Sequence, residues 1–335
     1  MSDDNRGETP GDQFDHLGAE GGSGLVEPTE EMTDALLGAV GYGETADEFA
    51  GMIDIGDRYL GLRANGVGAK LSLAQELGEY AAVGTDCVAL PVNDLVADGL
   101  TPVAFVNYLG VDEADETVAR MIASGLAEGA EQAGLLLLGG EMSVKPDAIS
   151  GFDLVGTAAG VAEPTEVFPG DAATGDRLVG FPASGIHASG VEMARSILES
   201  EYEYSDPVPG EESATIGERL LQPTRLYSSL LSPLRESTVH AAVHVAAGGL
   251  SKLTSMGEYR YSIIDPIEPP PLFDLIQETG DVDLETMYRT FTMGTGFVVA
   301  LPESAASEVV SATDGRIIGV VERGSGVNIR GMELD

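Results

Sequence analysis

The chain has 335 residues, of which 17 are basic and 56 acidic, so its formal net charge is −39. Such a surplus of carboxylates repels nucleic-acid phosphates and anionic lipids and argues against binding to either. The composition is typical of a halophile's protein, whose carboxylates are solvated and screened by concentrated salt. An apolar content of 43% is enough for two globular domains of ordinary size.

Cysteine usage and hydropathy indicate a cytoplasmic protein. The single cysteine, Cys87, cannot form an intrachain disulfide and is expected in the core. No run of 18 apolar residues is present, and the N-terminus is acidic where a signal peptide would be basic. We therefore expect neither a membrane partner nor a nucleic-acid partner.

The N-terminal half begins with a polar segment, 1–34, whose composition predicts an acidic mobile leader. A helix is expected over 29–40 and a strand over 52–62. Residues 86–97 have helical periodicity, although Pro91 removes a helix hydrogen bond and favours a kink or a shifted start. The remaining elements expected here are strands over 102–109, 135–138 and 152–161 and a helix over 117–133.

Pro164, Pro169 and Gly170 predict the domain boundary, giving an N-terminal domain over 35–165 and a C-terminal domain over 170–335. The second half again alternates strand and helix. We expect an acidic solvated loop over 199–212, and the elements expected around it are strands over 177–181 and 297–301 and helices over 191–198, from 216 to 223 and from 226. Alternation in both halves predicts an α/β or α+β fold of two lobes, with ligands bound between them.

The stretch from Asn65 to Lys70 has the features of a phosphate-binding loop. Gly66 and Gly68 allow the backbone to approach an anion closely, and Lys70 adds a positive charge. A tight turn is the simpler interpretation, because the stretch matches neither common phosphate-loop pattern.

Oxygen-bearing side chains next to glycines or apolar runs indicate a nucleotide-metal site. Asp86, Asn93 and Asp94 lie in the expected helix, where Asp86 and Asn93 share a face, and Gly139-Gly140-Glu141 follows an apolar run. Carboxylates of this kind suit a divalent cation that bridges the protein to phosphates.

Together these motifs, in their order and spacing from about residue 35 to the end, resemble the phosphoribosylformylglycinamidine cyclo-ligases (aminoimidazole ribonucleotide synthetases) in a haloarchaeal-like form. The resemblance implies a two-domain fold in which the N-terminal sheets of two subunits pair into a shared barrel, giving a homodimer. It also implies the substrates, ATP and formylglycinamidine ribonucleotide, with Mg²⁺, and ring closure through a phosphorylated formyl oxygen in purine biosynthesis.

The resemblance assigns roles to particular residues. Asp94 and Glu141 are the implied metal ligands, and His187 and Arg289, in the motifs S-G-x-H-S-N-G and M-Y-R-T-F, are the implied catalytic residues. The implied nucleotide-binding residues are Asn65, Gly66, Gly68, Lys70, Asp86, Asn93, Asn107, Gly139 and Gly140.

Several polar positions depart from the family motifs, whereas the glycines persist. Asn65 and Asn107 replace aspartates, and the other changed positions are Ala69, Met142, Ser189 and Thr292. Loss of two carboxylates predicts impaired catalysis. The alternative is a non-catalytic paralogue that binds nucleotide in a regulatory or scaffold role.

The histidines and Arg289 each allow two interpretations. His240 and His244, four residues apart, are either metal ligands or hydrogen-bonded core residues. His187 is either a general acid or base or a hydrogen-bonded loop residue. Arg289 either contacts a phosphate or pairs with an acidic neighbour.

Overall fold

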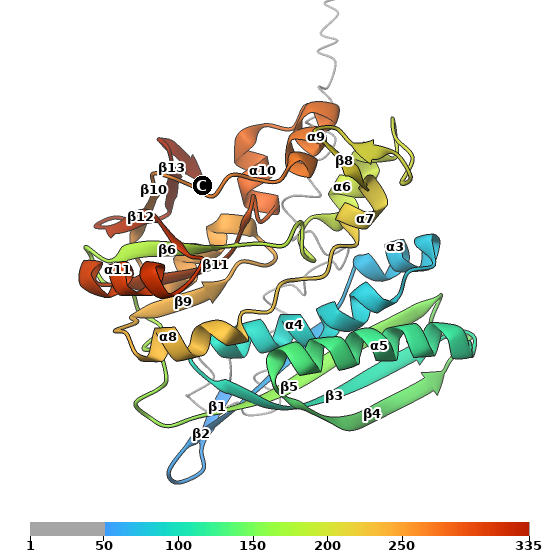
Figure 1. Cartoon of the computed structure of the whole chain (residues 1–335), viewed down its shortest axis with the longest axis horizontal. Coiled ribbons are helices and arrows are strands. Elements are labelled where there is room, and N and C mark those ends of the chain that lie inside the picture. Colours follow the sequence, from blue (N-terminus) through green and yellow to red (C-terminus); the bar gives the residue numbers. More distant parts are fainter. Residues whose placement is uncertain (1–50, 335) are drawn as a thin grey trace, which may run out of the picture.

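The computed structural model describes residues 51–334. The helix expected over 29–40 and the leader expected over 1–34 lie outside the described residues. Two sheets, separated by helices α4 and α5, organise the described part (Figure 1). The architecture is the mixed α/β fold of two domains that the alternating pattern predicts.

The first sheet has five strands in the order β1-β2-β5-β3-β4. All neighbours are antiparallel except β3 and β4, which are parallel and joined through α5. The elements of this half are β1 (Gly51–Asp54), β2 (Tyr59–Gly66), α3 (Lys70–Leu77), α4 (Ala81–Ala97), β3 (Thr101–Val111), α5 (Glu116–Ala133), β4 (Leu136–Val144) and β5 (Phe152–Ala162).

The second sheet has seven strands in the order β14-β13-β10-β12-β6-β11-β9, and a separate two-stranded sheet pairs β7 with β8. Its strands are β6 (Arg177–Pro182), β7 (Pro207–Val208), β8 (Glu211–Thr215), β9 (Ala241–His244), β10 (Arg260–Ile263), β11 (Thr295–Leu301), β12 (Arg316–Glu322), β13 (Val327–Ile329) and β14 (Met332–Leu334). The helices are α6 (Val191–Leu198), α7 (Ile216–Leu220), η2 (Ser228–Leu230), α8 (Leu231–Arg235), η3 (Gly249–Met256), α9 (Pro271–Gly280), α10 (Leu284–Thr290) and α11 (Glu303–Ala312).

Several predicted elements differ from the observed ones at their ends. The strand expected over 52–62 is a hairpin of β1 and β2, and β2 continues through Asn65 and Gly66 into the expected loop. The strand expected over 135–138 extends to residue 144, and the loop expected over 199–212 contains β7 and part of β8. The helix expected from 216 ends at Leu220, and the one expected from 226 is η2 followed by α8.

Helix α4 lies between the two sheets, packed on β2 and β5 on one side and against β9 on the other. It begins five residues earlier than expected and carries Pro91 in its interior. A proline there leaves the Cys87 carbonyl without its helical donor. At Gly156 of β5 a Cβ atom would lie 2.4 Å from that carbonyl oxygen, so strand and helix approach closely at this point. None of the helices among residues 51–334 is both long and apolar enough to cross a membrane.

Glycines set the distance between α4 and α5. A Cβ atom at Gly125 would lie 1.8 Å from the Ala81 carbonyl oxygen, and one at Gly84 would lie 2.3 Å from the Ile122 oxygen. Both contacts are to backbone, which cannot rotate away as a side chain can. The two helices therefore touch through their main chains.

We expect Gly125→Ala to destabilise the protein by about 3 kcal/mol, because the added methyl must push two buried helices apart. Thermal unfolding in molar salt measures this. Ser124→Ala, at the neighbouring exposed position of α5, is the matched control and should leave the midpoint nearly unchanged. Equal midpoints for the two variants would contradict the close helix contact.

Candidate active site

The centre of the candidate site is Asp94, near the C-terminal end of α4. Its carboxylate accepts hydrogen bonds from His244 Nδ1 at 3.2 Å, Arg63 Nε at 3.3 Å and Asn65 Nδ2 at 3.4 Å. Burial alone would raise the pKa of Asp94, but the His244 hydrogen bond and the Arg63 charge outweigh it and lower that pKa. Asp94 therefore joins the first sheet, through Arg63 and Asn65, to the second sheet, through His244.

Two other polar side chains of α4, one immediately before Asp94 and one about two turns earlier, hold a segment of the C-terminal domain, residues 222–227, which we call the strap. Asn93 Nδ2 donates to the Arg225 carbonyl at 2.8 Å, and Asn93 Oδ1 accepts from the Tyr227 amide at 2.9 Å. Asp86 Oδ1 accepts from the Thr224 amide at 2.6 Å. The shared face that the sequence predicts for Asp86 and Asn93 thus lies against protein backbone.

Lys70, the predicted phosphate contact, is fully buried at the start of α3. Its Nζ lies 3.0 Å from Asp86 Oδ2 and donates to the Gln222 carbonyl, also in the strap, at 2.5 Å. The contact between Lys70 and a nucleotide phosphate stays a prediction.

His187 lies in the loop after β6 with φ of 57° and is 1% exposed. Its Nε2 accepts from the Ser184 amide at 3.2 Å, so the neutral ring carries its proton on Nδ1, an atom that is buried without a hydrogen-bond partner. Burial lowers the pKa of His187 far below its ordinary value, helped by the positive charges of Lys70 and Arg225. The ring is a neutral donor at neutral pH.

Arg289, at the end of α10, pairs with Glu285 at 2.7 Å. It also adjoins Gly249, where a Cβ atom would lie 3.0 Å from the Arg289 carbonyl carbon. The acidic neighbour that the sequence suggests is therefore present, and a phosphate contact stays a prediction.

Four positions form a row across the first sheet. Asn65, Gly156, Asn107 and Gly140 are direct cross-strand partners on β2, β5, β3 and β4. Directly opposed residues share a face of the sheet, and the contact between Gly156 and Cys87 shows that this face is the one that α4 covers. The predicted nucleotide residues of three strands are thus brought together.

Glu141 is paired with Tyr108 and lies on the opposite face. It accepts from Ser143 Oγ at 2.9 Å, and Lys145 lies over the Tyr108 ring. The structure therefore does not bring Glu141 and Asp94, the two predicted metal ligands, together within one protomer. Among residues 51–334, no three His, Cys, Asp or Glu side chains are grouped to hold a metal ion.

The remaining predicted glycines have different local reasons. Gly68 and Gly139 have φ of 73° and 135°, which other residues rarely adopt. A Cβ atom at Gly66 would meet nothing within 4 Å, so this position borders open space.

His240 and His244 have separate partners. His240 Nδ1 lies 2.8 Å from Asp176, whereas His244 contacts Asp94 and Asn93. Neither pair is a metal cluster, so the hydrogen-bonded interpretation describes both residues.

Asp98, four residues after Asp94, directly follows the last residue of α4 and was not predicted as a site residue from the sequence. Burial raises its pKa to about 7, an effect that the Arg63 charge opposes and the Asp94 charge reinforces. The four-residue helical spacing from Asp94 was the available signal.

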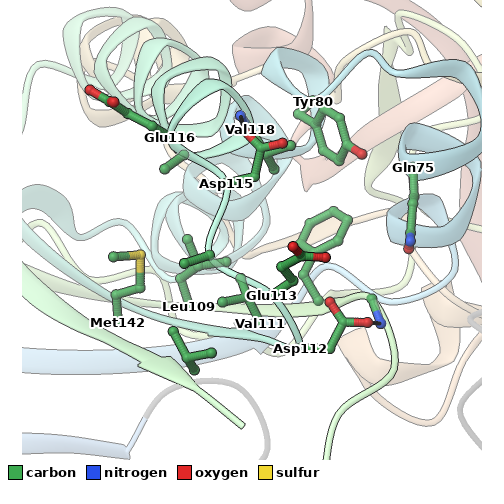
Figure 2. A pocket seen from close by; sticks show the side chains of 15 residues that line it. Gln75, Tyr80, Leu109, Val111, Asp112, Glu113, Asp115, Glu116, Val118 and Met142 are labelled. Carbon is green, nitrogen blue, oxygen red and sulfur yellow. Dashed lines mark hydrogen bonds between the residues drawn. The ribbon is translucent and has the colours of Figure 1, made fainter. Parts of the chain in front are cut away.

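A pocket of about 540 Å³ lies away from this site, between the start of α5, the ends of β3 and β4, and the turn before α4 (Figure 2). Leu109, Val111 and Met142 form an apolar floor, and Asp112 and Glu113 lie at the rim. Tyr80, which precedes α4, also lines it, so the pocket lies at the opposite end of α4 from Asp94. Its carboxylates disfavour phosphate and suit an apolar group with hydrogen-bond donors.

This geometry defines a two-domain α/β protein with a row of polar and glycine residues across one sheet, beneath a helix that lies between the domains. Two family models match the chain: the N-terminal domain of AIR synthase related proteins over residues 47–162 and their C-terminal domain over 173–331. The chain therefore belongs to the AIR synthase related family.

Curated relatives refine this membership. The phosphoribosylformylglycinamidine cyclo-ligase of Methanosarcina acetivorans is 40% identical over 289 residues, 86% of each chain. That of Thermococcus kodakarensis is 40% identical over 289 residues, 85% of this chain and 84% of its own. Among solved structures, AaThiL complexed with AMPPCP and TMP has a TM-score of 0.70 at 16% identity, covering 93% of this chain and 96% of that one. This last likeness concerns the fold alone.

The buried neutral His187 predicts a loss of stability in acid. Its folded pKa is lowered, so below about pH 6.5 the unfolded chain binds a proton that the folded chain refuses, and stability falls by about 1.4 kcal/mol per pH unit. We expect His187→Asn, which tolerates the positive φ, to lose less stability between pH 7 and pH 5 than the native protein.

Denaturant unfolding at both pH values in molar salt measures this difference. His240→Asn is the control, because His240 is partly exposed and paired with Asp176. An unchanged pH dependence in His187→Asn would refute the buried neutral ring.

Proposed function

We propose that this chain catalyses the ATP-dependent closure of formylglycinamidine ribonucleotide to aminoimidazole ribonucleotide. The observation that carries the proposal is 40% identity to a curated cyclo-ligase across 86% of both chains. Matches to both family domains support it. The reaction places the protein among the cytoplasmic ligases of purine biosynthesis, here adapted to high salt by its acidic surface.

The nucleotide is proposed to bind beside the row formed by Asn65, Asn107 and Gly140, where Gly66, Gly68 and Gly139 would admit its phosphates close to the backbone. Asp86 and Asn93 hold the strap from α4, so a direct contact of either with the nucleotide stays a prediction. The unpartnered His187 Nδ1 supports a role as donor to the ribonucleotide, and Arg289 is proposed to approach its phosphate.

Mg²⁺ is proposed to arrive with ATP. The described residues supply single carboxylates, Asp94 on one face and Glu141 on the other, and one carboxylate plus phosphate oxygens is an ordinary magnesium environment. Bound in this way, the ion neutralises phosphate charge during transfer. Three protein groups already donate hydrogen bonds to Asp94. Glu141 is exposed, so its carboxylate is the more accessible of the two to an ion that arrives with ATP.

A homodimer through the first sheet is proposed from exposed apolar side chains. Leu136 and Leu138 on β4 are more than 60% exposed, and Ile53 and Leu62 on β1 and β2 exceed half. β4 is also an edge strand. Apolar surface of this extent is costly in water, and a second copy removes it.

Light scattering in molar salt should therefore give twice the chain mass of 34.7 kDa. We expect Leu138→Glu to shift the protein toward the monomer, because a carboxylate cannot be buried there unpaired. Ile264→Glu, equally exposed in the C-terminal domain, is the control and should stay dimeric. A native monomer would refute the dimer proposal.

The amides at 65 and 107 are the reason to propose impaired catalysis. The Asn65 amide donates to Asp94, whereas an aspartate there would face Asp94 with a second negative charge and require a cation between them. The arrangement thus favours a weaker metal site. It also favours the second candidate, a non-catalytic paralogue that binds nucleotide.

The test measures aminoimidazole ribonucleotide formation in molar salt with magnesium. A carboxylate about 4 Å from a unit charge contributes about 4 kcal/mol, so we expect Asn65→Asp with Asn107→Asp to raise turnover by several orders of magnitude. Native turnover in the usual range of about 1 to 1000 per second would refute the impairment but keep the enzyme. Inactivity of both proteins with intact ATP binding would favour the paralogue.

A further inference from the structure

Side chains of the N-terminal domain hold the strap along its backbone. Four hydrogen bonds from these side chains reach its backbone: Lys70 donates to the Gln222 carbonyl, Asp86 accepts from the Thr224 amide, and Asn93 donates to the Arg225 carbonyl and accepts from the Tyr227 amide. They fall along one short extended segment, as the bonds from a partner strand would. Polar side chains of α3 and α4 thus take the place of that strand.

The Lys70 ammonium and the Asp86 carboxylate are both 0% exposed. A buried charge is stable only with a partner and hydrogen bonds, and here each charge has both the other and the strap. Removal of Lys70 from this environment to reach a nucleotide would leave Asp86 buried without its countercharge.

The strap in turn reaches the loop of His187. Ser184 Oγ donates to the Pro223 carbonyl at 2.6 Å, and the Ser184 amide donates to His187 Nε2 at 3.2 Å. The strap also carries Arg225, whose guanidinium pairs with Asp314 at 2.7 and 2.9 Å. A continuous set of contacts therefore runs from Lys70 and Asp86 to His187.

We propose that Lys70 and Asp86 are positioning residues: their buried interdomain pair holds the strap and, through Ser184, the His187 loop, and Lys70 is not a ligand of the nucleotide phosphates. The effect on substrate rests on the proposed cyclo-ligase function. The placement of Lys70 does not.

The first test uses the native protein and its lysine content. Lys70, Lys145 and Lys252 are the three lysines of the chain, so methylation of amines by formaldehyde and a mild hydride reductant, read by peptide mass, is readily assigned. Lys145 is exposed and serves as the internal positive control. We expect Lys70 to stay unmodified with and without ATP and magnesium. Modification of Lys70 in the free protein, with protection by ATP, would overturn the proposal.

The second test compares Lys70→Met, Asp86→Asn and the double variant. Each single change strands one buried charge, so each should lower the thermal midpoint by about 10 °C, and the double variant should recover most of that loss. Arg120→Met, which removes an exposed i,i+4 pair, is the control and should leave the midpoint nearly unchanged.

Calorimetry and kinetics on the double variant separate positioning from phosphate binding. We expect an ATP Kd within about twofold of native and a fall of about tenfold or more in kcat/KM for the ribonucleotide, because only the His187 loop is displaced. A tenfold weaker ATP Kd at recovered stability would overturn the proposal, as would an unchanged kcat/KM. If the native protein forms no aminoimidazole ribonucleotide, the proposed function fails, while lysine protection, midpoints and ATP affinity still decide the role of Lys70.

Discussion

The structure depends on one constraint: a helix buried on all sides that carries polar side chains. Residues 83–97 of α4 are almost all inaccessible to solvent, and Asp86, Asn93 and Asp94 are among them. Buried polar groups are costly unless they are hydrogen-bonded. Each of the three finds partners beyond its own helix, and most of those partners lie in the C-terminal domain. The same groups that are expensive to bury therefore join the two domains.

This arrangement changes the interpretation of acidic and amide residues near a glycine loop. Charge and residue type alone suggest that Asp86 and Lys70 face a nucleotide, yet they face each other and the strap. Asp94 lies between the domains, where Arg63 and His244 each donate a hydrogen bond to its carboxylate. Asp86 and Asn93 thus hold the strap, whereas Asp94 joins the two sheets at the candidate site.

The asparagine at 65 fits the same logic. Its amide adds a donor to a carboxylate that Arg63 already approaches, so the Asp94 group is satisfied without a metal ion. A carboxylate that is already hydrogen-bonded in this way has less need of a magnesium ion, so we expect the ion to bind weakly there. It also links the proposed impairment to a physical cause, the replacement of a negative charge by a hydrogen-bond donor.

The sequence alone determined the alternation of strands and helices, the two lobes, the single-face placement of Asp86 and Asn93, and a family resemblance that the comparisons confirm. These are local properties, set by periodicity, glycines and motif spacing. Only the tertiary structure decided that Asn65, Asn107 and Gly140 form one row, because cross-strand register is not encoded in any single strand. For the same reason, the sequence could not show that Glu141, one residue after Gly140, lies on the opposite face of the sheet. The partner of Lys70 was equally beyond the sequence, since Gln222 lies 152 residues away and a buried lysine is chosen by the groups that fold around it.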